Sequence, residues 1–203
     1  WLPWDDGVAC FTRPNNENGG RGMPRMCLAL LLLWLCGPAW ALLPVELDKP
    51  ELRLSLGAAM GYLQDPEGSL TLEQVSALGD DRFEMVRGEH VNLGKNRSVW
   101  WFKVRLHNSL TQALAGYLEV NYPLLDHIQI YLSDSDGDWR MQESGDRYAF
   151  TQRPVQVRNF WFPVTLPPGD NSLLVRVDTS STVFVPLFFS THNASAAAPE
   201  NLM

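Results

Sequence analysis

A run with a period of two, from Trp100 to Asn108, constrains the fold of this chain more than any other feature. Successive side chains of a β-strand point to opposite faces, so the run has two distinct faces. One face is apolar and carries Trp100, Phe102, Val104 and Leu106. We expect that face to pack into a core. The other face carries Trp101, Lys103, Arg105 and His107. We expect it to look onto solvent, as one face of an antiparallel sheet commonly does.

Similar patterns recur along the chain and predict further strands. The predicted strands are 51–56, 116–122, 127–132, 138–142, 160–166, 173–178 and 183–189. Residues typical of turns separate them. One short helix is expected near 70–77, because Ser69 and Thr71 precede Glu73 and Gln74 in the manner of a helix cap. Many strands with so little helix predict an all-β domain, a β-sandwich or jelly roll.

An apolar run over residues 27–36 divides the chain. Arg25 precedes the run, and Ala39-Trp40-Ala41 follows it with the spacing that precedes signal-peptidase cleavage. The run is shorter than the ~20 apolar residues that span a bilayer. We therefore expect an upstream extension (1–22), a secretory signal peptide (23–41, beginning at Met23 or Met26) and an exported domain (42–190).

Composition narrows the functions open to the exported part. All three cysteines, Cys10, Cys27 and Cys36, precede residue 42. The predicted domain therefore has no disulfide, no thiol nucleophile and no cysteine ligand for zinc, and its stability must come from core burial. The chain has a net charge of −7, which disfavours nucleic acid because binding phosphates needs clustered cations. Residues 191–203 are small and polar, and we expect them to form a tether toward a transmembrane region.

Three segments together resemble a known family. They are Trp100–Asn108, Asn121–Tyr131, which holds the sequence Tyr-Pro-Leu-Leu-Asp, and Asn159–Val164. These segments resemble the type-two extracellular sensor domain of bacterial seven-transmembrane receptors with diverse intracellular signalling modules. That family has a Trp-containing strand ending in Asn, and a Tyr-Pro-x-Leu-Asp hairpin leading into a strand with aliphatic residues and Tyr. The resemblance covers about residues 48–190.

The resemblance implies a jelly-roll β-sandwich similar to carbohydrate-binding modules. It also implies a position on the periplasmic side of the bacterial inner membrane, ahead of seven spans and a cytoplasmic histidine kinase or diguanylate cyclase. The family has no catalytic residues to carry over, so no enzymatic activity is expected. The chain would then be the ligand-sensing input of a membrane-embedded receptor. Its signal would be a shift in domain orientation or in the arrangement of a homodimer.

The polar face of the long strand is the first candidate ligand site. The residues predicted to contact a ligand are Trp101, Arg105, His107 and Tyr131. Flat aromatic rings beside hydrogen-bonding groups suit a carbohydrate, whose C–H face packs on a ring while its hydroxyls bind polar partners. Tyr117, Glu119, Asn121, His127 and Gln129 are expected on neighbouring strands. The alternative is that this face is simply a solvated sheet surface.

Two clusters of aspartates are candidate cation sites. Asp134, Asp136 and Asp138 alternate as in the opening of a calcium loop. Gly137 and Gly145 do not fit the rest of that pattern, and an Asp-Gly hairpin turn is the competing interpretation. Asp80 and Asp81 form the second cluster.

A calcium-sensing or other cation-sensing domain is therefore one alternative function. An accessory module of a secreted carbohydrate-active enzyme is another. The sequence has no histidine pair spaced for zinc and no nucleophile motif.

Overall fold

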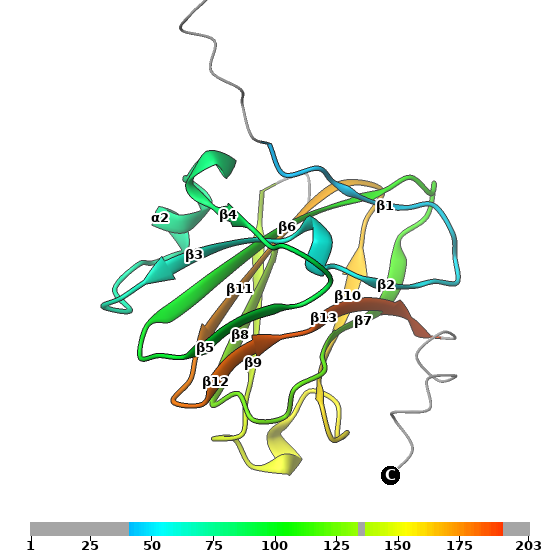
Figure 1. The fold of residues 1–203 in the computed structure, drawn as a ribbon. Helices are drawn as coiled ribbons and strands as arrows, with labels where there is room; N and C mark the ends of the chain where they lie inside the picture. Colours follow the sequence, from blue (N-terminus) through cyan, green and yellow to red (C-terminus); the bar gives the residue numbers. More distant parts are fainter. Residues whose placement is uncertain (1–40, 134–136, 193–203) are drawn as a thin grey trace, which may run out of the picture. The chain divides into compact units, whose positions relative to one another are not determined.

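The structure, a computed structural model, describes residues 41–133 and 137–192 (Figure 1). The predicted upstream extension lies outside the described residues. So do all but the last residue of the predicted signal peptide and all but the first two residues of the predicted tether. Asp134 and Asp136 also lie outside them.

Two sheets, mostly antiparallel, form the body of the domain (Figure 1). The larger runs in the order β4 (Glu84–Met85), β3 (Gly61–Asp65), β6 (Val99–Asn108), β11 (Gly169–Asp178), β8 (His127–Ser133) and β9 (Trp139–Ser144). β1 (Val45–Leu47) pairs with β6 in parallel. The smaller runs in the order β10 (Phe160–Leu166), β7 (Leu114–Val120), β13 (Leu187–Thr191) and β2 (Arg53–Ser55).

Shorter elements complete the fold. A two-stranded ribbon pairs β12 (Thr182–Val185) with β5 (Val91–Lys95). The helical elements are η1 (Gly57–Ala59), α2 (Leu72–Ser76), η2 (Asp80–Arg82) and η3 (Phe150–Gln152). The architecture is a jelly-roll-like β-sandwich with one short α-helix within the predicted range 70–77, so the predicted fold class is confirmed.

The core lies between the sheets, on the face of β6 that the sequence predicts. Trp100 is 7% exposed, and Phe102, Val104 and Leu106 are fully buried. Leu118, Phe162 and Phe189 of the smaller sheet join them in the same cluster. Each fully buried side chain of this size contributes roughly 1.5–3 kcal/mol relative to leaving it exposed. The face of β6 therefore fixes which side of the larger sheet meets the smaller one.

The opposite face of β6 is partly buried as well. Thr71 caps α2 by accepting a hydrogen bond from the Gln74 N–H, and the Gln74 side chain accepts one from the Thr71 N–H. α2 then packs Val75 onto the sheet beside Trp101. The expectation that this face looks onto solvent is thus wrong near Trp101, because α2 and the segment after it cover the sheet there.

Pro186 divides one of the predicted strands into two. The segment 183–189 is two strands, β12 and β13, which belong to different sheets and are separated by Pro186. Proline has no N–H to donate to a ladder, so a strand pairing is interrupted there. The sequence does not predict β1, β3, β4 and β5, because their two to five residues are too few to show a clear period.

Candidate functional site

The four predicted ligand residues all lie on the larger sheet, but they do not form one open surface. Trp101 is 1% exposed, so the expectation that it presents its ring to solvent is wrong. The ring stacks on Tyr131, with centroids 5.8 Å apart and an interplanar angle of 23°. Tyr131 lies on β8, which is separated from β6 by β11, so the two rings meet across the intervening strand. Trp101 belongs to a second apolar cluster, which consists of Val75, Phe83, Val99, Trp101 and Leu174. Tyr131 packs against this cluster and is half-buried.

Arg105 is engaged in an ion pair on the same face. Its guanidinium lies 2.8 Å from Asp80, and the ammonium of Lys103 lies 3.0 Å from the other oxygen of that carboxylate. The backbone N–H of Leu42 donates to Asp80 at 3.1 Å. Burial disfavours the charged carboxylate, but these hydrogen bonds and the two cations outweigh it, so the pKa of Asp80 lies below its usual value. Two protein cations thus already neutralise the first of the two aspartates predicted at 80–81.

His107 lies further along β6 and is bound to a neighbouring strand. Its Nδ1 lies 2.6 Å from a carboxylate oxygen of Asp170 on β11. This hydrogen bond, more than any other influence, raises the pKa of His107 above its usual value. Arg105 and His107 therefore pair with carboxylates of the protein itself, and their role as ligand contacts stays a prediction.

The predicted neighbours of this face divide between the two sheets. His127 and Gln129 of β8 lie on the larger sheet, where both contact Glu143. Tyr117 and Glu119 lie on β7 in the smaller sheet, so the expectation that they flank β6 is wrong. Glu119 is fully buried, receives a hydrogen bond from the Ser190 hydroxyl and pairs with Arg53 at 3.0 Å.

The same expectation fails for Asn121, which immediately follows β7. Its backbone N–H donates to Pro186 and its side chain accepts from Asn159, both of which lie next to strands of the smaller sheet. Following its strand, Asn121 therefore belongs to the smaller sheet rather than to the neighbours of β6.

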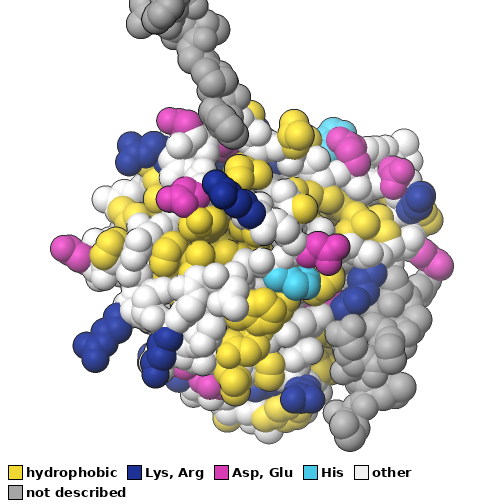
Figure 2. Space-filling view, viewed as in Figure 1, with side chains coloured by type: hydrophobic (Ala, Val, Ile, Leu, Met, Phe, Trp, Pro, Cys, Tyr) yellow, Lys and Arg dark blue, Asp and Glu magenta, His cyan; other side chains and the backbone are white. Residues whose placement is uncertain are grey.

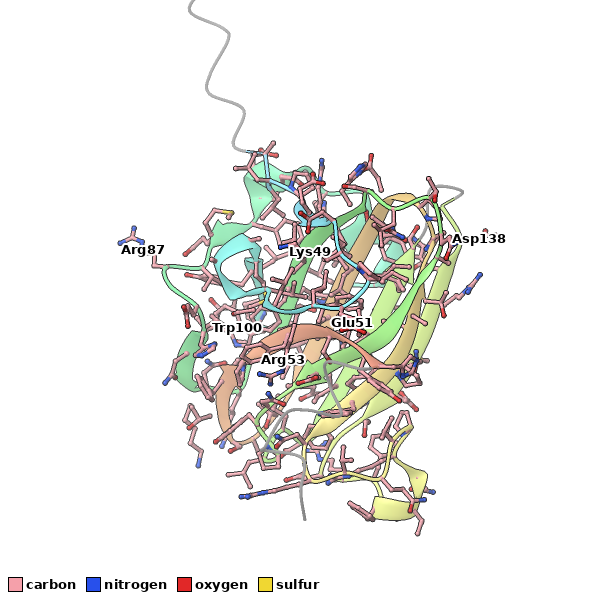
Figure 3. The ribbon with its side chains drawn as sticks, turned by 90° about the vertical axis from the view of Figure 1, so that its right-hand side faces the viewer. Lys49, Glu51, Arg53, Arg87, Trp100 and Asp138 are labelled. Atoms are coloured by element: carbon pink, nitrogen blue, oxygen red, sulfur yellow. The ribbon has the colours of Figure 1, made fainter. Side chains whose placement is uncertain are left out.

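The aspartate-rich segment joins two strands of a hairpin. β8 and β9 pair antiparallel and end opposite each other at Ser133 and Trp139, as the turn interpretation expects. Asp138 is exposed and lies at the side of the molecule opposite Arg87 (Figure 3). Within residues 41–133 and 137–192, no group of three His, Cys, Asp or Glu side chains is arranged to hold a metal ion. Calcium binding at Asp134, Asp136 and Asp138 stays a prediction.

A groove that the sequence analysis did not find opens at the other edge of the larger sheet. Tyr62 of β3 pairs with Phe102 of β6 and with Glu84 of β4, so the Tyr62 and Glu84 side chains lie on the core-facing side of the sheet. Beside them is a hollow of about 850 Å³. Its lining includes Tyr62, Glu84, Arg87, His90, Asn92 and Leu93. The site therefore lies between strands β3 and β4 on one side and β5 on the other.

A second hollow of about 330 Å³ adjoins the first and shares Tyr62, Glu84 and Leu93 with it. Trp100 lines this second hollow, and its ring lies 5.9 Å from that of Tyr62. The Tyr62 hydroxyl donates to Glu84 at 2.7 Å, and this bond is the main reason that the pKa of Tyr62 is raised. No signal in the sequence places these residues together, because β3 and β4 are short and meet β5 only in the folded chain.

The fold is a jelly-roll-like β-sandwich with a groove at one edge of the larger sheet. Residues 57–191, from η1 to the end of β13, match the family model described as 7TMR-DISM extracellular 2. The chain belongs to this family, which confirms the resemblance found in the sequence. The match places the chain among the extracellular domains of seven-transmembrane receptors.

Two solved structures share a distant likeness. One is TmCBM61 in complex with β-1,4-galactotriose, with 12% identity and a TM-score of 0.33 over 68% of this chain and 87% of that chain. The other is exo-β-1,3-galactanase from Phanerochaete chrysosporium with β-1,3-galactotriose, with 10% identity and a TM-score of 0.28 over 68% of this chain and 27% of the galactanase. No curated protein matches. Among the described residues, no helix is long and apolar enough to cross a membrane.

Proposed function

We propose that this chain is the periplasmic ligand-sensing domain of a bacterial membrane receptor, and that it binds a small molecule or carbohydrate without transforming it. The observation that carries the proposal is the family match, which spans both sheets and the β5–β12 ribbon. The groove beside Tyr62 adds a concave surface of a size typical of ligand sites.

The proposed mechanism is a shift between two arrangements of the receptor. A ligand moves such an equilibrium only by binding one arrangement more tightly than the other. The ligand would therefore change the orientation of the domain, or the pairing of two copies. The output, a histidine kinase or diguanylate cyclase, would lie beyond the residues of this chain.

The reading frame beyond Met203 tests the receptor assignment. We expect it to encode seven apolar segments of about 20 residues each, followed by a signalling module. Fusing residues 1–203 to the membrane and output parts of a receptor with a measurable reporter then tests sensing directly. A reading frame that continues into a hydrolase domain would contradict the proposal and favour an accessory module. So would turnover of a glycan by the purified chain.

The face of the larger sheet that carries Tyr131 stays the second proposed contact surface. Tyr131 is half-buried, and Met141, its partner across β8 and β9, is 50% exposed. Arg105 and His107 lie on the same face, each beside its carboxylate partner. Replacing Tyr131 with alanine distinguishes this surface from the groove, because the two lie on opposite faces of the sheet.

A further inference from the structure

We infer that the groove bounded by Tyr62, Glu84, Arg87 and Asn92 binds an uncharged oligosaccharide. This inference rests on the proposed sensing function and names the site and the ligand class for it. The groove lies on the core-facing side of the larger sheet, at the edge that β3 and β4 form. Phe83 and Leu63 line it and also pack in the cluster around Trp101, but neither Trp101 nor Tyr131, which the sequence pattern favoured, lines it.

The shape of the groove suits a chain of linked units. Two hollows of about 850 and 330 Å³ adjoin along a border formed by Tyr62, Glu84 and Leu93. The larger one alone falls within the roughly 300–1,000 Å³ that small-molecule sites occupy. Two neighbouring hollows can each hold one part of a linear ligand, such as successive rings of an oligosaccharide.

The charges around the groove balance. Asp81 and Glu84 supply two carboxylates, and Arg82 and Arg87 supply two guanidinium groups. Figure 2 shows the same mixture on this side of the molecule, where single cationic and anionic side chains interrupt the hydrophobic surface. A lining without net charge does not select a charged ligand. Its carboxylates accept from hydroxyl groups and its guanidinium groups donate to them, which is the pairing that a neutral sugar needs.

Polar groups in the groove remain available to a ligand. Arg87 is exposed and projects from the ribbon toward solvent (Figure 3). Within the described residues it makes no hydrogen bond or ion pair. Asn92 uses its Oδ1 to accept from the Gly94 N–H at 3.1 Å, and its amide N–H₂ group has no partner within the described part of the chain. Both groups can therefore donate to ligand hydroxyls without giving up a bond of the fold.

Aromatic surface lies between these polar groups. The rings of Tyr62 and Trp100 are tilted by 55° with centroids 5.9 Å apart. Hydrogen bonds fix both rings, from the Tyr62 hydroxyl to Glu84 and from the Trp100 Nε1 to the Asn96 Oδ1 at 2.8 Å. Trp100 is only 7% exposed and lies beside Tyr62, so the half-buried Tyr62 ring is the surface on which the C–H face of a sugar can pack at little entropic cost.

One wall of the groove is held in place before any ligand arrives. The Ser55 hydroxyl donates to the carbonyl oxygen of Glu89 at 3.2 Å. A Cβ atom at Gly57 would lie only 1.7 Å from that oxygen, so only glycine lets the segment 87–90 pack directly onto η1. Arg87 and His90, which line the groove, flank this anchored point. A preformed wall reduces the cost of ordering the site on binding.

Titration of the full chain with neutral and charged sugars tests the inference. The probes are maltotriose, cellotriose and β-1,4-galactotriose, with trigalacturonic acid as the charged comparison. The readout is the indole N–H resonance of Trp100, assigned through the Trp100→Phe variant. We expect saturable shifts with at least one neutral probe and none with the acid. Arg87→Ala and Glu84→Gln, both at exposed positions, should each raise the dissociation constant at least tenfold.

Controls separate failure of the site from failure of the function. Arg140→Ala, at an exposed position on β9, should leave affinity unchanged, and equal melting temperatures should show that every variant is folded. Loss of binding in Tyr131→Ala with full binding in both groove variants would overturn the groove while leaving the sensing function intact. Binding of the acid alone, or of no neutral probe, would overturn the ligand class. The reading frame beyond Met203 would still decide the receptor assignment.

Discussion

Trp100 and Trp101 are adjacent in the chain and both are buried, at 7% and 1% exposure, on opposite faces of β6. A period of two correctly separates the faces but says nothing about what covers each one. Trp100 belongs to the main apolar cluster between the sheets, whereas Trp101 belongs to a second cluster with Val75 of α2 and Phe83. The expectation that Trp101 is exposed is wrong because the element that covers it lies about 25 residues away in the chain, and its contact with a ligand stays a prediction.

Replacing Trp101 with alanine should therefore destabilise the fold. A buried tryptophan truncated to alanine typically costs about 3–5 kcal/mol, since the cavity that remains closes only partly. Urea unfolding followed by far-UV circular dichroism measures the change. Trp101→Phe, which retains an aromatic ring against Tyr131, should lose clearly less. Unaltered stability in Trp101→Ala would show that α2 does not pack on this face.

Asp80 should contribute stability that depends on pH. Asp80→Asn removes the charge that compensates Lys103, whose side chain is 10% exposed, and breaking such a buried pair costs on the order of 3 kcal/mol. The pKa of Asp80 is lower in the folded chain than the ordinary value of 3.8. Its contribution is thus complete above that value and is lost as the pH falls through the folded value.

Stability curves of Asp80→Asn and the parent chain at several pH values check this expectation. The difference between them should be constant near neutral pH and shrink in acid. Asp138→Asn, at an exposed position, provides the matched control. A difference that grows as the pH falls would contradict the ion pair.

At the scale of elements, α2 shows what local sequence can predict. Its start follows from the capping pattern of Thr71 and Gln74, which the structure contains in both directions. β10 has the predicted bounds, 160–166. The segment 183–189 was predicted as one strand because its apolar residues are continuous, whereas Pro186 divides it between two sheets. Caps and alternating patterns therefore predict the position of a single helix or strand, but they do not predict which sheet a strand joins.

Thr71→Ala should cost about 1 kcal/mol, the usual effect of removing a helix cap. The variant leaves the Gln74 N–H without its hydroxyl acceptor. Because Val75 of α2 packs against Trp101, the loss should also loosen that cluster. Hydrogen exchange of the α2 amides should accelerate, and Thr111→Ala, at an exposed position, should leave it unchanged. Equal exchange rates in the two variants would contradict the role of the cap.

At the scale of the whole molecule, the sequence predicted a sandwich but not which strands share a sheet. Tyr117 and Glu119 were expected beside β6, yet β7 lies in the other sheet, between β10 and β13. β6 instead pairs with β11, about 70 residues later in the chain. Such pairings depend on core packing over long sequence separations, which period and turn signals do not contain. The groove was missed for the same reason, because β3, β4 and β5 line it only once the sheets have assembled.

The assembly should unfold as one unit. The main apolar cluster joins Leu47, Phe102, Val183 and Phe189, which come from both sheets and the ribbon. We therefore expect a protein of residues 41–192 to show a single transition, with near-UV and far-UV circular dichroism curves that coincide. Refolding should take milliseconds to seconds, because β-sandwiches rely on non-local pairings. Two separate transitions would mean that the sheets are independent, and a ligand bound at the edge of the larger sheet could not then bias the whole domain.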